Sequence, residues 1–340
     1  MKAVVVCPGR GTYGKGELGS LLRLHSAKRD LLAGYEAVRA AAGQDSLAAL
    51  DGAARFDVAR HTRGDNASAL IHAMTVADAM DLAGVEVVAV TGNSMGWYSA
   101  LAVAGALAPV EGFRLANGMG ALMQAALIGG QLVYPHMGDD WRPDPARKAD
   151  LLALVARIGA RPGHQLALSI DLGGMLVLAG DEAGLAAFEA AVPKAGQFPL
   201  RLPNHAAFHT ALQAPVAAKG RAAYLGLPWQ QPALPMIDGR GEIWWPRSSD
   251  LGALADYTLG HQVTAPYDFT RAISVAAREF APDLFIVTGP GTTMGGAVAQ
   301  SLVLANWRGM SSKDDFMARQ AERPVLVSMG REDQRRLVTG

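Results

Sequence analysis

Three short apolar runs, rich in β-branched residues and poor in polar ones, are the clearest feature of the hydrophobic pattern. They cover residues 3–7, 85–91 and 284–288. Runs of this kind are typical of strands that are buried on both faces of a parallel sheet. A turn that contains glycine follows each run, and segments with helical spacing, such as 19–42, 67–83 and 97–106, lie between them. The pattern therefore predicts an α/β fold built on a parallel sheet.

The segment from residue 129 to residue 203 has a pattern of its own, which begins at a pair of glycines. Its elements are expected in the order β-α-β-β-α-β, which is the order of a ferredoxin-like unit. In chain order they cover residues 131–134, 145–158, 165–170, 175–179, 182–192 and 197–202. We therefore predict a catalytic core formed by residues 1–128 and 204–340, with a small ferredoxin-like subdomain, residues 129–203, inserted into it.

Composition and charge narrow the classes of function. Basic and acidic residues balance at 31 each and no basic block occurs, so a nucleic-acid-binding surface is not expected. No apolar run approaches the roughly 18 to 20 residues that cross a bilayer. No targeting segment is visible either, so the sequence predicts a cytoplasmic protein that does not use a membrane. The single cysteine, Cys7, excludes an intramolecular disulfide.

The strongest sign of chemistry is the sequence Gly92-Asn93-Ser94-Met95-Gly96, which lies between the second apolar run and an alanine-rich helical segment. A tight strand-to-helix turn requires small residues on both sides of a nucleophile. Such a turn would expose the Ser94 hydroxyl above the sheet edge, beside the free N–H groups of a helix N-terminus, which can stabilise an oxyanion. The alternative that Ser94 only caps the helix stays open.

A nucleophilic serine needs a general base, which is normally a histidine. Among the eight histidines, His25 and His61 lie in charged stretches that we expect to be exposed. His164, which lies in a loop, and His72, on the face of a helix, are also set aside. The remaining candidates are His136, His205, His209 and His261. His209 lies where the chain returns from the insert to the core, and clefts often form between domains. Spacing alone does not choose between His205 and His209.

The turn at residues 8–11, Pro-Gly-Arg-Gly, follows the first apolar run. Its backbone N–H groups could supply a second oxyanion donor, although an ordinary strand-to-helix turn is the simpler explanation. No nucleotide-binding fingerprint is matched. Asp139 and Asp140 lie near His136, but they have the pattern of a solvated loop, so no metal site is predicted.

An ordered set of motifs extends over roughly residues 3–305 of the chain. Its segments are residues 8–11, 92–96, 120–124, 175–180, 207–210, 262–270 and 289–291. As a set they resemble malonyl-CoA:acyl-carrier-protein transacylase and the acyltransferase domains of fatty-acid and polyketide synthases. The resemblance implies an α/β-hydrolase-like core with a ferredoxin-like insert, in agreement with the pattern of elements.

The resemblance also implies a ping-pong reaction without a cofactor, in a monomer whose partners are acyl-CoA and an acyl carrier protein. Ser94 would attack the acyl-CoA with His209 as general base, and the phosphopantetheine thiol of the carrier protein would then take the acyl group. The backbone N–H groups of Arg10 and Met95 would form the oxyanion hole. Asp268 occupies the family position that supports the histidine, through either its backbone carbonyl or its carboxylate.

The positions that recognise the acyl group depart from the family pattern. Met119 replaces the arginine that binds the malonyl carboxylate, and Arg114 lies on a different face of the same predicted helix. A thioether cannot pair with a carboxylate, and an unpaired buried carboxylate is costly. A neutral or altered acyl group is therefore an alternative to malonyl. Gln124 keeps the family residue, and the resemblance places both Met119 and Gln124 beside the substrate.

Three more departures surround the nucleophile. Asn93 and Trp97 replace a histidine and a glutamate, and the resemblance places both of them beside the substrate. Arg10 replaces a glutamine, and its side chain could reach a carboxylate or a CoA phosphate. Two further functions stay open, an acyl hydrolase on the same fold and a non-catalytic module that binds a carrier protein.

Overall fold

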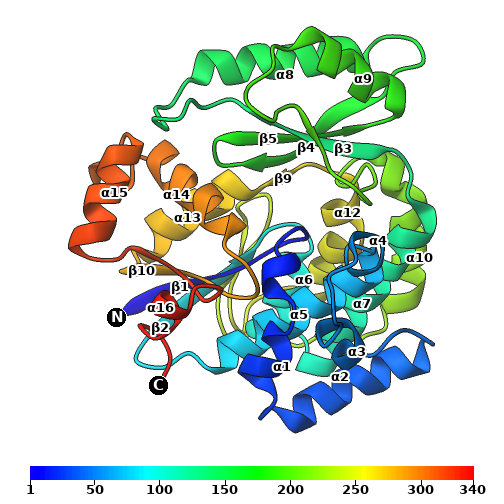
Figure 1. Ribbon diagram of the computed structural model, residues 1–340, viewed down its shortest axis with the longest axis vertical. Helices are drawn as coiled ribbons and strands as arrows, with labels where there is room; N and C mark the ends of the chain where they lie inside the picture. The colour runs from blue at the N-terminus through cyan, green and yellow to red at the C-terminus, as the bar shows by residue number, and fades with distance from the viewer.

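The computed structural model describes all 340 residues and contains two β-sheets with helices packed around them (Figure 1). The first sheet has six strands in the order β11-β10-β1-β2-β7-β8, and every neighbouring pair is parallel except β7 and β8. Its strands are β1 (Lys2–Cys7), β2 (Glu86–Gly92), β7 (Met236–Ile237), β8 (Ile243–Trp244), β10 (Leu284–Val287) and β11 (Leu326–Ser328). The three apolar runs of the sequence thus form three neighbouring strands, and the predicted parallel sheet is confirmed.

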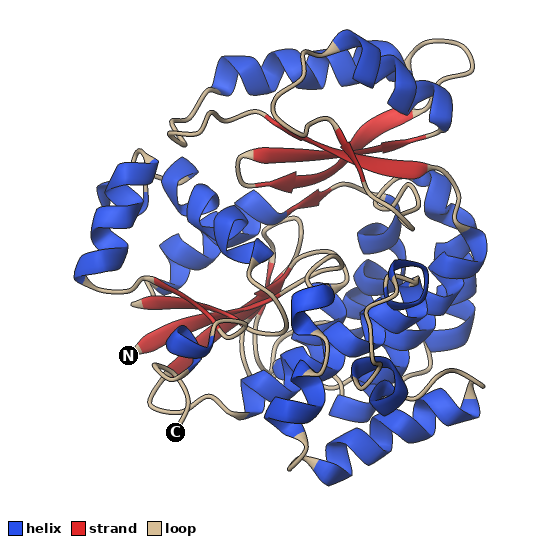
Figure 2. Cartoon of the chain, viewed as in Figure 1, coloured by secondary structure: helices blue, strands red, loops and turns tan.

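Strand β1 lies at the centre of this sheet because its side chains are apolar on both faces. Residues 3–7 are all fully buried, and Val5 lies between Ile286 of β10 and Val90 of β2. A strand buried on both faces needs helices above and below the sheet. Figure 2 shows the resulting arrangement, in which helices lie on both sides of this sheet.

Helices α5 (Gly64–Met80) and α7 (Pro109–Ala126) pack along each other and form much of the core beside the sheet. Their backbones approach most closely at two glycines. A Cβ atom added at Gly64 would lie 2.5 Å from the carbonyl oxygen of Gly120, and the reverse substitution would meet the same obstacle. Only glycine permits this contact, which fixes how α7 is positioned against α5.

The second sheet has the order β6-β3-β5-β4-β9, and its first four strands are antiparallel. They are β3 (Gly130–Pro135), β4 (Leu166–Leu172), β5 (Met175–Gly180) and β6 (Leu200–Arg201), with α8 (Pro145–Gly159) after β3 and α9 (Glu182–Ala191) after β5. This is the predicted β-α-β-β-α-β order, and its side chains form a separate small hydrophobic cluster. The α/β fold class is confirmed, while the domain boundaries at residues 128 and 203 stay a prediction.

One short strand links the two sheets. Strand β9 (Tyr267–Asp268) pairs in parallel with β4 of the second sheet, where Tyr267 lies opposite Ile170. The Tyr267 hydroxyl donates a hydrogen bond of 2.6 Å to the carbonyl oxygen of Gly92, the last residue of β2 in the first sheet. The end of β2 is therefore tied directly to the second sheet.

The helices of this fold belong to its packed layers. None of them is both long enough and apolar enough to cross a membrane. The predicted helical segment after residue 19 is divided into α1 (Ser20–His25) and α2 (Arg29–Ala41). His25 and His61, which we expected to be exposed, are buried, because both side chains find hydrogen-bond acceptors inside the protein.

Candidate active site

Ser94 lies on a sharp turn between β2, which ends at Gly92, and α6 (Gly96–Val103). Its φ of 55° is in the left-handed region, which is uncommon for a residue other than glycine and is typical of strained functional turns. A Cβ at Gly96 would lie 2.2 Å from the carbonyl oxygen of Cys7, and one at Gly92 would lie 2.4 Å from the backbone of Gly96. The glycines on both sides of Ser94 are therefore required by close backbone contacts.

The Ser94 hydroxyl is paired with the imidazole of His209. The distance from Ser94 Oγ to His209 Nε2 is 2.7 Å. On the other side of the ring, His209 Nδ1 lies 2.6 Å from the backbone carbonyl oxygen of Gln262, to which it must donate its proton. This contact selects the tautomer in which Nε2 is unprotonated and accepts a hydrogen bond from the serine hydroxyl.

The residue that orients His209 is therefore Gln262 and not Asp268. Asp268 is the N-cap of α13 (Phe269–Phe280), and its Oδ1 accepts a hydrogen bond of 2.8 Å from the backbone N–H of Arg271. The expectation for Asp268 was wrong because the group that contacts the imidazole is a backbone carbonyl, which every residue possesses. No side-chain identity in the sequence marks such a carbonyl.

The side chain of Gln262 also supports the site. Its Nε2 donates a hydrogen bond of 2.9 Å to the carbonyl oxygen of Ser94. Its Oε1 accepts a hydrogen bond of 3.1 Å from the Tyr98 hydroxyl, which comes from α6. Gln262 thus contacts the turn that carries the serine and the histidine that is paired with it. This double contact fixes the two side chains relative to each other.

Burial keeps the imidazole of His209 neutral. Removal from solvent lowers the pKa of His209 to about 4, and the hydrogen bond to the Gln262 carbonyl opposes part of this shift. A histidine with this pKa is unprotonated at neutral pH, as a general base must be. His209 lies in the chain that leaves the second sheet after β6.

The other histidine candidates have different partners. His205 Nδ1 lies 2.8 Å from Gln131 Oε1, and His136 Nε2 lies 2.9 Å from the carbonyl oxygen of Gly173. His261 is exposed. None of the three is hydrogen-bonded to Ser94, so the geometry separates His205 from His209, which spacing alone could not do.

Two backbone N–H groups near the serine are free. Neither Arg10 nor Met95 donates a backbone hydrogen bond within the protein, and both residues line the same pocket as Ser94. Met95 precedes the first residue of α6, so its N–H belongs to the unpaired N-terminal turn of that helix. Unpaired N–H groups at such a position can receive negative charge that develops on a reacting oxygen.

A small pocket lies in front of Ser94. Besides residues already described, it is lined by Ser68, Gly120, Met123, Phe208 and Val263. We did not anticipate Ser68 and Phe208. The side of a helix or loop that faces the pocket depends on how α5, α7 and the segment around His209 pack together, which no local pattern shows.

Two predicted substrate-binding residues of α7 lie outside the lining of this pocket. Met119 is fully buried, and its Sδ packs so tightly on α10 (Ala214–Tyr224) that a Cβ at Gly220 would lie 2.6 Å from it. Gln124 Oε1 accepts a hydrogen bond of 2.7 Å from the backbone N–H of Gly64, at the start of α5. Both side chains stabilise the packing of α7, and the expectation that they contact substrate is not supported.

Asn93 and Trp97, which depart from the family pattern beside the nucleophile, also lie outside the lining of the pocket. Trp97 is fully buried, and its indole Nε1 donates a hydrogen bond of 2.9 Å to Thr258 Oγ1. Asn93 is buried with its Nδ2 3.8 Å from the sulfur of Met294, and its Oδ1 has no hydrogen-bond partner. Neither side chain lines the pocket, so neither is placed to contact a substrate there.

One cluster of possible metal ligands lies elsewhere in the molecule. His25, Asp78 and Asp81 bring their ligand atoms within 4.8 Å of one another. Both carboxylates are already paired with cations, because Arg335 contacts Asp78 and lies 2.9 Å from Asp81, and Lys28 also contacts Asp81. We interpret the cluster as an ion-pair network that ties the C-terminal helix α16 (Glu332–Arg335) to α5.

Buried neutral histidines make the stability of the fold depend on pH. Burial lowers the pKa of His72 to about 3 and that of His209 to about 4, and it also lowers the pKa values of His136 and His205. In the unfolded chain these groups take up protons near pH 6.5. Between about pH 6.5 and 4 the unfolded state binds more protons than the folded state, so the free energy of unfolding falls as the pH falls.

We expect urea denaturation at pH 7.5, 6.0 and 5.0 to show that the free energy of unfolding falls as the pH falls. The decrease should reach up to about 1.4 kcal/mol per pH unit for each buried neutral histidine. His72→Gln removes one of these groups and should make the dependence shallower. Equal stability at pH 7.5 and 5.0 would contradict the prediction.

Comparisons with known proteins were made with the sequence and with the structure. No protein-family model and no curated protein sequence matches the chain. Among solved structures, an acyl-carrier-protein S-malonyltransferase from Burkholderia pseudomallei 1710b has 22% identity and a TM-score of 0.77, with 99% of both chains covered. The malonyl-CoA:acyl carrier protein transacylase from Xanthomonas oryzae pv. oryzae has 19% identity and a TM-score of 0.78, with 99% of this chain and 98% of that one covered.

A third similar structure contains a type II polyketide-synthase acyl-carrier protein in complex with its malonyl-transacylase. It has 20% identity and a TM-score of 0.72, and the match covers 95% of this chain and 99% of that one. The chain therefore has the fold of malonyl-CoA:acyl-carrier-protein transacylases over nearly its whole length. The resemblance stated from the sequence motifs is confirmed at the level of the fold.

Proposed function

We propose that the protein is an acyltransferase that moves an acyl group from coenzyme A to the phosphopantetheine thiol of an acyl carrier protein. The observation that carries the proposal is the 2.7 Å contact between Ser94 Oγ and a neutral, oriented His209. The transacylase fold and the two free backbone N–H groups beside the serine support it.

In the first half of the reaction, Ser94 Oγ attacks the carbonyl carbon of the acyl thioester while His209 Nε2 takes the hydroxyl proton. The carbonyl oxygen becomes an oxyanion, which the N–H groups of Arg10 and Met95 stabilise. The carbon–sulfur bond then breaks, the proton on His209 passes to the CoA thiolate, and an acyl-serine ester remains.

In the second half, the thiol of the carrier protein occupies the place of CoA. His209 takes the thiol proton as the sulfur attacks the ester carbonyl, and the same two N–H groups stabilise the second oxyanion. When the ester bond breaks, His209 returns the proton to Ser94 Oγ. The acyl group has then moved from one thiol to another, and the enzyme is restored without a cofactor.

The proposal is tested by intact-protein mass spectrometry after the protein is mixed separately with malonyl-CoA and acetyl-CoA. We expect a covalent acyl adduct from at least one thioester, and transfer of that acyl group to a carrier protein that bears phosphopantetheine. The same carrier protein without phosphopantetheine is the matched control and should receive nothing. If neither thioester forms an adduct, the proposal fails; if the adduct disappears equally fast without carrier protein, the protein is a hydrolase.

A further inference from the structure

The side chain of Arg10 enters the pocket of Ser94 and is held there by two loops. Its Nη2 donates hydrogen bonds of 2.7 Å to the carbonyl oxygen of Thr62 and of 3.0 Å to that of Asn204. The guanidinium carbon lies 5.5 Å from the centre of the Phe208 ring, which also lines the pocket. The guanidinium group is therefore fixed in orientation.

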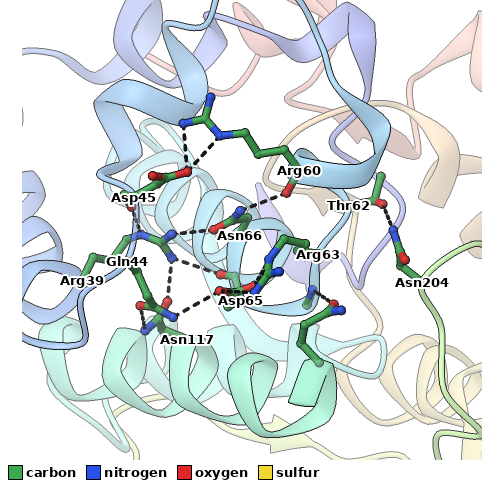
Figure 3. A network of polar contacts seen from close by, with 12 residues as sticks. Arg39, Gln44, Asp45, Arg60, Thr62, Arg63, Asp65, Asn66, Asn117 and Asn204 are labelled. Carbon is green, nitrogen blue, oxygen red and sulfur yellow. Dashed lines mark hydrogen bonds and ion pairs between the residues drawn. The ribbon is translucent and has the colours of Figure 1, made fainter. Parts of the chain in front are cut away.

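The two loops that hold Arg10 are themselves joined. Asn204 Nδ2 donates a hydrogen bond of 2.7 Å to Thr62 Oγ1, a contact seen at the right of Figure 3. Thr62 precedes α5, and Asn204 lies in the chain that leaves the second sheet just before His209. The support of Arg10 thus comes from the same two segments that form the walls of the pocket.

This guanidinium group has no anionic partner in the protein. Its Nε is buried and makes no hydrogen bond, and its two acceptors are neutral carbonyl groups. No aspartate or glutamate lines the pocket. Asp65, whose charge acts on Arg10 without a direct contact, pairs with Arg63 at 3.2 Å within the network of Figure 3. Burial lowers the pKa of Arg10 to about 10, so it stays protonated at neutral pH.

Helix α7 supplies no other cation to the pocket. Arg114, its only basic residue, lies 3.4 Å from Glu111 and lines a separate surface groove between α2 and α7. Met119 packs away from the pocket, against Gly220. Arg10 is therefore the only permanently charged residue among those that line the pocket.

We propose that Arg10 binds the free carboxylate of a short dicarboxylic acyl thioester, of which malonyl-CoA is the simplest example. This inference rests on the proposed function, because it concerns the acyl group that Ser94 receives. A buried cation without a counter-ion is costly, and a carboxylate that pairs with it removes that cost. Nη1, which makes no hydrogen bond in the protein, can donate to the carboxylate, and the hydroxyl of Ser68, which lines the same pocket, offers a further donor.

The position of Arg10 favours an acyl carboxylate over a CoA phosphate. Arg10 lines the same pocket as the nucleophile, where the thioester carbonyl must bind, and its guanidinium group lies beside Phe208 of the same pocket. The phosphates of CoA are separated from the thioester by the whole pantetheine arm. A malonyl carboxylate is only two bonds from the thioester carbonyl carbon.

The test compares the rates at which malonyl-CoA and acetyl-CoA acylate Ser94 in the wild type, Arg10→Met, Arg10→Lys and the control Arg63→Met. We expect the wild type to prefer malonyl-CoA. Arg10→Met should lower the rate with malonyl-CoA about 10- to 100-fold and change the rate with acetyl-CoA only a few-fold, because only malonyl loses a charge-assisted hydrogen bond. Arg10→Lys should keep part of the preference, and Arg63→Met should keep all of it.

A second measurement tests binding alone. It therefore depends neither on the reaction nor on the assignment of the nucleophile. Malonate should raise the thermal unfolding temperature of the wild type and of Arg63→Met, but not that of Arg10→Met, while acetate should raise none of them. The inference is overturned if Arg10→Met keeps the wild-type ratio of the two rates, or if malonate stabilises the wild type no more than Arg10→Met. Failure of both thioesters to acylate the wild type would count against the proposed function, and the malonate measurement would still decide the role of Arg10.

Discussion

Ser94→Ala is expected to abolish the covalent acyl adduct completely, since no other hydroxyl in the pocket is paired with a neutral histidine. Alanine keeps the Cβ on the turn and removes only the oxygen that attacks the thioester. The turn itself should persist, because it depends on the glycines at 92 and 96 and on the hydrogen bond from Gln262 to the Ser94 carbonyl. Intact-protein mass spectrometry after incubation with the thioesters measures the effect.

Ser26→Ala is the matched control for this experiment, because Ser26 is an exposed serine at the end of α1, far from any catalytic contact. It should be acylated like the wild type. Peptide mapping of the wild-type adduct should place the acyl group on Ser94 alone. An adduct that persists on Ser94→Ala would show that the nucleophile has been assigned wrongly.

His209→Ala should slow acylation by about 10²- to 10⁴-fold, which is the usual contribution of a general base. The neutral state of His209 adds a second expectation, on pH. With a pKa of about 4, the imidazole stays unprotonated as the pH is lowered from 8 to about 5, so the wild-type acylation rate should change little over this range. Rapid-quench measurements of adduct formation across this range check both expectations.

Two other histidines serve as controls. His164→Ala alters a turn of the second sheet whose histidine contacts only its own loop, and it should leave the rate unchanged. His205→Ala removes the alternative base, which is bonded to Gln131, and should slow the reaction much less than His209→Ala. A larger loss in His205→Ala, or a wild-type rate that halves near pH 6.5, would contradict the assignment of His209.

The parts of the fold that the sequence predicted are those with a strong local pattern. The first strand was predictable because five consecutive apolar residues fit only a strand with both faces covered, and β1 has that position. The order of elements in the second sheet was predictable because turns that contain glycine separate segments with strand spacing from segments with helical spacing. The division of the segment after residue 19 into α1 and α2 was missed, because the apolar spacing continues across the break.

In the candidate site, too, only residues with a local mark in the sequence could be predicted. Ser94 was recognisable because its turn requires glycines on both sides, which leave a mark in the sequence. Gln262 was missed because it orients His209 through its backbone, and the position of a backbone carbonyl depends on the whole path of the chain. Met119 was expected beside the substrate, but the direction of its side chain is set by the rotation of α7, which the glycine contact between α5 and α7 determines.

The hydrogen bond between Ser94 and His209 joins the end of the parallel sheet to the segment in which the chain leaves the antiparallel sheet. The serine stands at the end of a strand of the parallel sheet, and the histidine stands where the chain leaves the antiparallel one, with Tyr267 bridging the two sheets at Gly92. Neither sheet is a catalytic unit by itself. The parallel sheet carries the nucleophile Ser94, and the chain that leaves the antiparallel sheet carries the base His209. The pair forms only when both sheets are folded and packed together.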